Sequence, residues 1–112
     1  MPDHAAARVH LVDDNDGFRE STAWLLETAG FEVESSPSAG AFLDSRGERP
    51  PPGTVECLVS DIRMPQMSGV QLQEELRRRG DAIPLVFVTA PGDVPLAVEA
   101  MRKGAANFLE KP

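Results

Sequence analysis

The chain has 112 residues, a formal net charge of −7, 41% hydrophobic residues and 26% charged residues. This length and composition predict one globular domain over residues 1–112, and the acidic charge argues against direct nucleic-acid contact. The single cysteine excludes an internal disulfide, and no apolar run approaches the roughly 18 residues of a membrane span, so we expect a cytoplasmic protein without membrane contact.

The first part of the chain predicts a strand, a helix, a second strand and a short helix. An apolar run at 9–12 predicts a buried strand, and alternation at 31–35 predicts a strand nearer the sheet edge. Between them a helix begins at about Asp16 and ends at Gly30, a C-cap residue. Ser38 is a predicted N-cap for the short helix. The inward positions of the two helices are Phe18, Thr22, Leu25, Ala29, Ala39, Phe42 and Leu43.

Residues 46–53 interrupt this pattern. The segment Arg-Gly-Glu-Arg-Pro-Pro-Pro-Gly contains no apolar residue other than proline. Proline removes amide donors and favours extended backbone, so we predict an exposed and fairly stiff loop.

The remainder predicts strands at 57–59, 85–88 and 107–110, separated by two helices. Cys57 is expected to be a small buried core residue. The first of these helices covers about 70–79, with Leu72 and Leu76 inward. The inward stripe of the second is Val94, Ala97, Val98 and Met101. Alternation of strands and helices predicts a parallel sheet with right-handed crossovers.

Polar residues follow four of the predicted strands: Asp13 and Asp14 the first, Asp61 the third, Thr89 the fourth and Lys111 the fifth. Because the carboxyl ends of parallel strands meet at one edge of the sheet, these side chains are expected to share one crevice.

Three carboxylates in one crevice raise each other's pKa unless a cation is present. Magnesium resolves that conflict, since it binds one or two carboxylates together with water and phosphate oxygens. The alternative is a set of solvated aspartates that cap helices. Asp13 and Asp14 alone would favour that alternative, whereas the combination with Asp61, Thr89 and Lys111 favours the metal site.

The segment Ser-Asp-Ile-Arg-Met-Pro-Gln-Met-Ser-Gly at 60–69 resembles the phosphoacceptor loop of response-regulator receiver domains, the targets of sensor histidine kinases. The acidic pair, the Thr-Ala at 89–90 and the Lys-Pro at 111–112 agree with this, and residues 92–101 are similar to the FixJ group. The resemblance implies a flavodoxin-like (CheY-like), doubly wound α/β fold with a five-stranded parallel sheet of order 2-1-3-4-5.

The resemblance also implies a role for each acidic residue. Asp61 matches the aspartate that accepts a phosphoryl group, and Asp14 matches a direct Mg²⁺ ligand. Asp13 matches the partner that often acts through a water. The backbone carbonyl of Arg63 matches the remaining protein ligand.

Three further positions match the family's response machinery. Lys111 corresponds to the lysine that pairs with the phosphoryl group, and Thr89 to the hydroxyl that closes on it. Phe108 corresponds to the aromatic switch residue, which rotates as Thr89 moves and reshapes the face of the fourth helix and fifth strand. Lys111-Pro112 is expected to be cis, as in the family.

The chain departs from the family pattern in two places. It stops after the fifth strand, so we expect the fifth helix to be absent, an apolar face to be exposed, and the chain to self-associate as a dimer. The parent protein is expected to carry a DNA-binding effector domain that controls transcription. Pro91 replaces the histidine usual in FixJ-type chains, and we expect Pro91 and Arg63 to tune the rate of phosphate loss.

Two other functions compete with this one. An aspartate-nucleophile phosphatase usually has a second acid two residues after the nucleophile, where this chain has Arg63, so we expect no enzyme beyond self-catalysed phosphotransfer and autodephosphorylation. A phosphorylation-independent interaction domain usually lacks one of the acids, the threonine or the lysine, and this chain keeps them all.

Overall fold

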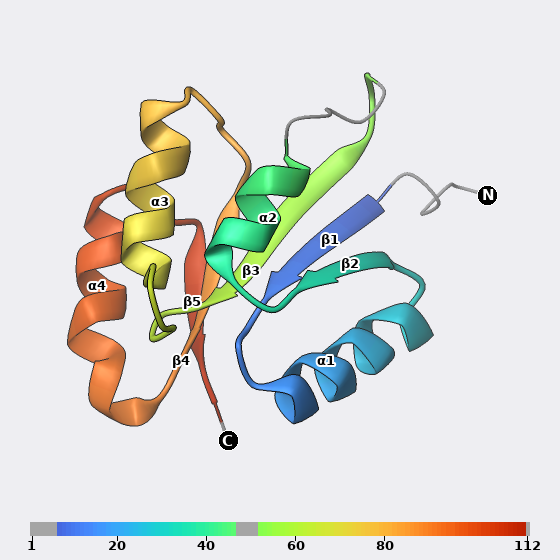
Figure 1. Ribbon diagram of the computed structural model, residues 1–112, viewed down its shortest axis with the longest axis horizontal. Coiled ribbons are helices and arrows are strands. Elements are labelled where there is room, and N and C mark those ends of the chain that lie inside the picture. Colours follow the sequence, from blue (N-terminus) through green and yellow to red (C-terminus); the bar gives the residue numbers. More distant parts are fainter. Residues whose placement is uncertain (1–6, 47–51, 112) are drawn as a thin grey trace.

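The computed structural model describes residues 7–46 and 52–111 and forms one parallel five-stranded sheet of order β2-β1-β3-β4-β5 (Figure 1). The predicted fold class and strand order are confirmed. The strands are β1 (Ala7–Val12), β2 (Glu32–Ser36), β3 (Val55–Asp61), β4 (Leu85–Thr89) and β5 (Asn107–Glu110). The helices are α1 (Asp16–Thr28), α2 (Ala39–Ser45), α3 (Gly69–Arg78) and α4 (Val94–Arg102), with a 3₁₀ turn, η2 (Pro91–Asp93), before α4.

Polar caps fix where three helices begin. Asn15 caps α1 by accepting from the Phe18 backbone N–H at 2.9 Å, and the predicted cap Ser38 accepts from the Ala41 backbone N–H at 3.1 Å. Ser68 and Gln71 form a reciprocal capping box at the start of α3. These caps set the lengths of the connections that follow β1 and β3, where the candidate site lies.

The main core lies between the sheet and helices α2, α3 and α4. Residues in strand register alternate between faces, so Val12, Leu58 and Phe87 point to this side, where Leu72 and Phe42 meet them. All five have no more than 1% of their surface exposed. The prediction that Leu72 and Leu76 face inward is confirmed.

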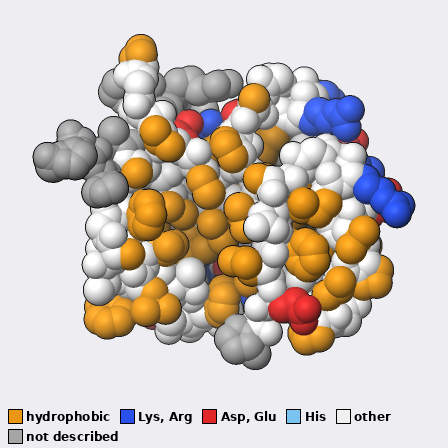
Figure 2. All heavy atoms as spheres, turned by 180° about the vertical axis from the view of Figure 1, so that it is seen from behind, with side chains coloured by type: hydrophobic (Ala, Val, Ile, Leu, Met, Phe, Trp, Pro, Cys, Tyr) orange, Lys and Arg blue, Asp and Glu red, His pale blue; other side chains and the backbone are white. Residues whose placement is uncertain are grey.

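The other face of the sheet is less covered. Val59 and Val86 are half-buried there, and their neighbour Leu109 is 58% exposed. Figure 2 shows hydrophobic side chains gathered across the rear face of the molecule, with few charges among them. The large exposed hydrophobic side chains of the described residues are Trp24, Leu25, Phe31, Val55, Leu96, Val98, Met101 and Leu109.

Two predicted helix faces are wrong by about one position. In α1 the half-buried stripe runs through Phe18, Thr22 and Leu26, whereas Leu25 is 61% exposed. Adjacent leucines satisfy the helical period almost equally, so the sequence could not choose between them. The predicted Ala29 lies past the end of α1 and is exposed.

In α4 the buried residues are Ala97 and Ala100, while Val98 and Met101 are 40% and 37% exposed. A small residue at Ala100 lets α3 approach closely, and the Gln73 side chain of α3 donates to the Ala100 carbonyl oxygen at 3.0 Å. The prediction that Val98 and Met101 face inward is therefore wrong.

Two smaller predictions also need correction. Cys57 is half-buried rather than buried, and partial burial raises the pKa of its thiol. Arg46 was predicted to begin the exposed loop, but its side chain is buried. Residues 47–51 of that loop lie outside the described residues, as does the Lys111-Pro112 bond that was predicted to be cis. Among the described residues, no helix is long and apolar enough to cross a membrane.

Candidate functional site

Strand register places the acidic residues side by side. Val12 of β1 pairs with Ser60 of β3, so the next residues, Asp13 and Asp61, leave neighbouring strands at the same level. Each of Asp13, Asp14 and Asp61 offers a carboxylate oxygen, and these oxygens all lie within 4.8 Å of one another. The predicted convergence of the three carboxylates is therefore present.

The acidic cluster differs in burial from one residue to the next. Asp13 is 1% exposed, Asp14 is exposed, and Asp61 lies between these extremes. Asp13 Oδ1 accepts from the Asn15 backbone N–H at 2.9 Å, which leaves Oδ2 directed toward the site. Burial raises the pKa of Asp61 and the charge of Asp13 raises it further, although Lys111 opposes both.

Lys111 reaches the cluster from the end of β5. The backbone carbonyl oxygen of Thr89 accepts from the Lys111 backbone N–H at 2.7 Å, which fixes the lysine's backbone beside the end of β4. The Lys111 Nζ lies 3.1 Å from Asp61 Oδ2 and 3.4 Å from Asp13 Oδ2. Burial lowers the pKa of Lys111, but the hydrogen bond and charge of Asp61 outweigh that effect, so the net shift is upward.

The Lys111 ammonium has a second neighbour, the aromatic ring of Phe18 in α1. Its Nζ lies 4.5 Å from the ring centroid, within the range of a cation–π interaction. The ammonium is thus held between two carboxylates and a ring, which limits the positions that the flexible lysine stem can sample.

The loop after β3 is shaped by a close approach of Gly69. Its N–H donates to the Ile62 carbonyl oxygen at 2.7 Å and closes the loop. A Cβ at this position would overlap the Asp61 carbonyl oxygen and the Phe87 ring, so the local backbone requires glycine. Ile62 is 1% exposed and anchors the same loop in the core.

Arg63, two residues after Asp61, points to the far side of the crevice. Its Nε donates to Asp93 Oδ1 at 2.8 Å, where η2 leads into α4. Arg63 is largely exposed, whereas the Asp93 side chain is only 10% exposed. The ion pair links the Asp61 loop to the segment that follows Thr89.

Thr89 lies at the C-terminal end of β4 and Phe108 lies within β5, the positions in the chain that the sequence predicted. Thr89 is fully buried, and its hydroxyl donates to the Ala90 carbonyl oxygen at 3.1 Å. Phe108 is half-buried, pairs in register with Phe87 and packs against the core cluster. Within the described residues, neither side chain has a recorded hydrogen bond or ion pair with the acidic cluster.

The donor set fits a hard divalent cation. Three carboxylates provide oxygen ligands, which Mg²⁺ prefers, and the mutual repulsion of Asp13 and Asp61 is only partly offset by Lys111. The fit rests on the carboxylates. The fourth predicted ligand is the backbone carbonyl of Arg63, a residue that lies two positions after Asp61 in the loop that follows β3.

Sequence reasoning did not predict the contacts of two residues of the site. Phe18 was assigned to the inward face of its helix, and Asp93 was given no contact. Both act through partners distant in sequence, Lys111 and Arg63 respectively. No local pattern signals such contacts. An aromatic residue one turn into the helix after the acidic pair is the only available hint.

Comparisons with known proteins agree with this geometry. The response regulator receiver domain family matches residues 9–112. The chain is 51% identical over 104 residues to the transcriptional regulatory protein FixJ of Azorhizobium caulinodans, covering 93% of this chain and 47% of that protein. It is 36% identical over 112 residues to the response regulator protein TodT of Pseudomonas putida, covering 100% of this chain and 47% of TodT.

Solved structures give the same result. A crystal structure of FixJ-N has a TM-score of 0.85 and 44% identity, covering 100% of this chain and 84% of that one. Full-length FixJ from B. japonicum has a TM-score of 0.84 and 42% identity, covering 94% of this chain and 50% of that one. The chain thus spans about half the length of the curated relatives it matches. Fold, site and comparisons together place this chain in the response regulator receiver domain family, as a FixJ-like member.

Proposed function

We propose that the chain accepts a phosphoryl group from a sensor histidine kinase onto Asp61 and uses it as a signal. The observation that carries this is the position of the Asp61 carboxylate, 3.1 Å from the Lys111 ammonium and beside Asp13 and Asp14. A nucleophilic carboxylate, a fixed cation and two further metal-binding acids are what phosphoryl transfer requires.

The chemistry is a displacement at phosphorus. A carboxylate oxygen of Asp61 forms a bond to phosphorus while the bond between phosphorus and the donor's histidine nitrogen breaks, and that nitrogen keeps the electron pair. Lys111 neutralises charge on the transferred group. Asp13, Asp14, Asp61 and the Arg63 carbonyl would hold Mg²⁺, which neutralises phosphate charge when bound. Attack of water on phosphorus then breaks the bond to the Asp61 oxygen, releases inorganic phosphate and returns the free carboxylate, so the domain is a phosphoacceptor and catalyses only its own reactions.

The proposed switch starts at Thr89. Its hydroxyl donates to the neighbouring Ala90 carbonyl oxygen in the present arrangement and would turn to a phosphoryl oxygen instead. That movement displaces segment 90–93 and opens space for Phe108 to rotate. The face of α4 and β5 then changes shape, which is a local charge event acting on a two-state element.

The proposed partners follow from the same surface. Leu96, Val98 and Met101 of α4 and Leu109 of β5 are exposed, which supports self-association as a dimer. The chain is about half as long as FixJ and TodT, both named as regulators, so we propose that the parent protein carries an effector domain that controls transcription.

Incubation with acetyl phosphate, with and without Mg²⁺, followed by intact mass, tests the proposal. We expect one added phosphoryl group that requires Mg²⁺, disappears in Asp61→Asn and persists in Asp44→Asn, a matched change at an exposed carboxylate of α2. Absence of the added mass in the unmodified chain would favour the phosphorylation-independent interaction domain instead.

A further inference from the structure

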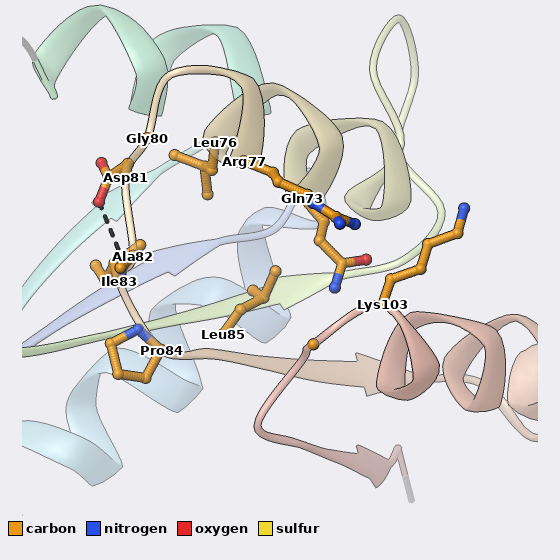
Figure 3. A pocket seen from close by; sticks show the side chains of 11 residues that line it. Gln73, Leu76, Arg77, Gly80, Asp81, Ala82, Ile83, Pro84, Leu85 and Lys103 are labelled. Carbon is orange, nitrogen blue, oxygen red and sulfur yellow. Dashed lines mark hydrogen bonds between the residues drawn. The ribbon is translucent and has the colours of Figure 1, made fainter.

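A second site lies at the opposite edge of the sheet, where the strands begin. A pocket of about 520 Å³ opens between the C-terminal turn of α3, the connection to β4 and the turn after α4. We call it the basal pocket; its lining includes Gln73, Leu76, Arg77, Ile83, Leu85 and Lys103 (Figure 3). Asp61 and Thr89 lie at the other ends of β3 and β4, so the pocket is separate from the acidic site.

The floor of the basal pocket contains a buried hydrogen-bond acceptor without a donor. Gln73 is 7% exposed, and its Nε2 donates to the Ala100 carbonyl oxygen at 3.0 Å. That bond fixes which way the carboxamide points, and its Oε1 accepts from no described group. A buried acceptor left without a donor is costly, so a ligand that supplies an N–H gains from this oxygen.

The rim of the pocket carries two cations without an ion-pair partner in the described part of the chain. Among the described residues, no ion pair involves Arg77 or Lys103, and both side chains are exposed. The neighbouring basic residues are all compensated: Arg78 and Arg79 bind Glu75, and Arg102 binds Glu99. In a chain of net charge −7, two unpaired cations at one pocket are a local reversal of sign.

The single carboxylate of the pocket does not cancel these cations. Asp81 accepts two hydrogen bonds from the guanidinium of Arg46, at 2.8 Å and 3.1 Å, and is buried with it. In Figure 3 the carboxamide of Gln73 lies between the side chains of Arg77 and Lys103. Leu76, Ile83 and Leu85 supply the apolar part of the lining.

Three chemical requirements therefore meet in one place: an anion for Arg77 and Lys103, an N–H donor for Gln73, and an apolar group. The end of a polypeptide combines all three, because its terminal carboxylate stands next to the last backbone N–H and the last side chain. Capture of a C-terminal carboxylate is a recurrent mode of peptide recognition. We propose that the basal pocket binds the C-terminus of a polypeptide that ends in an apolar residue.

Two acetylated peptides of sequence Ala-Ala-Leu test this, one with a free C-terminal carboxylate and one with a C-terminal amide. Each is titrated into the ¹⁵N-labelled chain while its amide spectrum is recorded. We expect the free acid to shift the amide resonances of residues 80–83, 85 and 103–105 and the side-chain amide of Gln73. Its dissociation constant should be at least about ten-fold lower than that of the amide, which lacks the charge.

Matched variants separate a specific site from general attraction between charges. Arg77→Gln and Lys103→Gln should each weaken binding of the free acid several-fold, whereas Arg78→Gln, one residue along the same exposed helix turn, should not. All three side chains are exposed, so the fold is expected to tolerate each change. Equal binding of acid and amide, equal loss in Arg77→Gln and Arg78→Gln, or no shift at millimolar peptide would overturn the proposal.

Discussion

Arg63 donates from Nε to Asp93 Oδ1 at 2.8 Å and so joins the loop that carries Asp61 to the start of α4. The link crosses the site from β3 to the segment that follows Thr89. We expect Arg63→Ala to release this segment, open the site to water and shorten the lifetime of the phosphorylated state. Decay of the phosphorylated mass after removal of acetyl phosphate measures that lifetime.

The control for Arg63 is Arg102→Ala, which removes the exposed ion pair between Arg102 and Glu99 of α4, at 3.6 Å. Arg102→Ala should change the free energy of unfolding by less than about 1 kcal/mol, because exposed ion pairs contribute little. Arg63→Ala should cost more, about 1–3 kcal/mol, because the Asp93 side chain is only 10% exposed and loses this donor. An equal lifetime in Arg63→Ala and the unmodified chain would show that the link has no part in hydrolysis.

Pro91 lies in the same segment, at the first position of η2. Its ring fixes φ and restricts the backbone between Thr89 and Asp93. We predict that Pro91→His loosens this segment and shortens the lifetime of the phosphorylated state, measured in the same decay experiment. An unchanged half-life would contradict a role for Pro91 in tuning phosphate loss.

Phe18 is predicted to position Lys111. Replacing it by leucine keeps an apolar side chain of similar reach but removes the aromatic face, so the ammonium gains freedom. Because an exposed cation–π contact contributes about 0.5–1 kcal/mol, we expect phosphorylation by acetyl phosphate to slow about two- to five-fold. Phe18→Trp restores an aromatic face and should restore the rate. Slowing in both variants would indicate lost packing instead.

Gly69→Ala tests the shape of the Asp61 loop. The added methyl group would overlap the Asp61 carbonyl oxygen and the Phe87 ring, which a packed core does not accommodate. We expect the free energy of unfolding in urea to fall by about 1–3 kcal/mol, together with slower phosphorylation. Gly40→Ala in α2 is the control, because its nearest neighbour lies at 4.0 Å and alanine favours helices. Equal stability of the two variants would contradict this account of the loop.

Glu56 gives the fold a defined response to acid. Burial raises the pKa of Glu56, but hydrogen bonds from Arg46 at 2.7 Å and 3.0 Å and from His10 at 2.9 Å outweigh it, so the net shift is downward. The unfolded state therefore binds a proton more readily than the folded state. The stabilisation is present above about pH 4.5, the ordinary value, and is lost as the pH falls through the lower folded value.

Glu56→Gln should accordingly reduce the free energy of unfolding by about 1–2 kcal/mol at pH 7 and by much less at pH 3. Glu99→Gln, at an exposed pair, should show no such difference between the two pH values. Urea unfolding at both pH values measures the effect. A loss for Glu56→Gln that is the same at pH 3 would contradict the assignment.

The parts of this domain that follow from local chemistry could be predicted from the sequence. Ser38 caps α2 as expected, and the strand at 107–110 has the predicted bounds, because capping and periodicity involve neighbouring residues only. The acidic cluster could also be predicted from the sequence, because the carboxyl ends of parallel strands lie at one edge of the sheet. Leu25 shows the limit of periodicity, as Leu26 fits the same stripe and faces inward instead.

Contacts between distant segments could not be predicted. Phe18 and Lys111 lie far apart in the sequence, and only the folded sheet with α1 brings the Lys111 Nζ to 4.5 Å from the centroid of the Phe18 ring. Arg46 is a similar case: a proline-rich segment follows it, yet its guanidinium is buried against Glu56 and Asp81. Both sets of contacts join segments that are distant in the sequence, so they form only in the tertiary fold.

The network around Arg46 has a consequence for how the domain responds to solutes. At the edge where strands begin, opposite charges attract within a buried cluster, and dissolved ions screen such pairs weakly. At the edge where strands end, the carboxylates of Asp13, Asp14 and Asp61 repel one another near solvent. Ionic strength therefore acts weakly on the ion pairs of Arg46, whereas divalent cations relieve the repulsion among Asp13, Asp14 and Asp61, so the two charge clusters of one sheet respond differently to the composition of the medium.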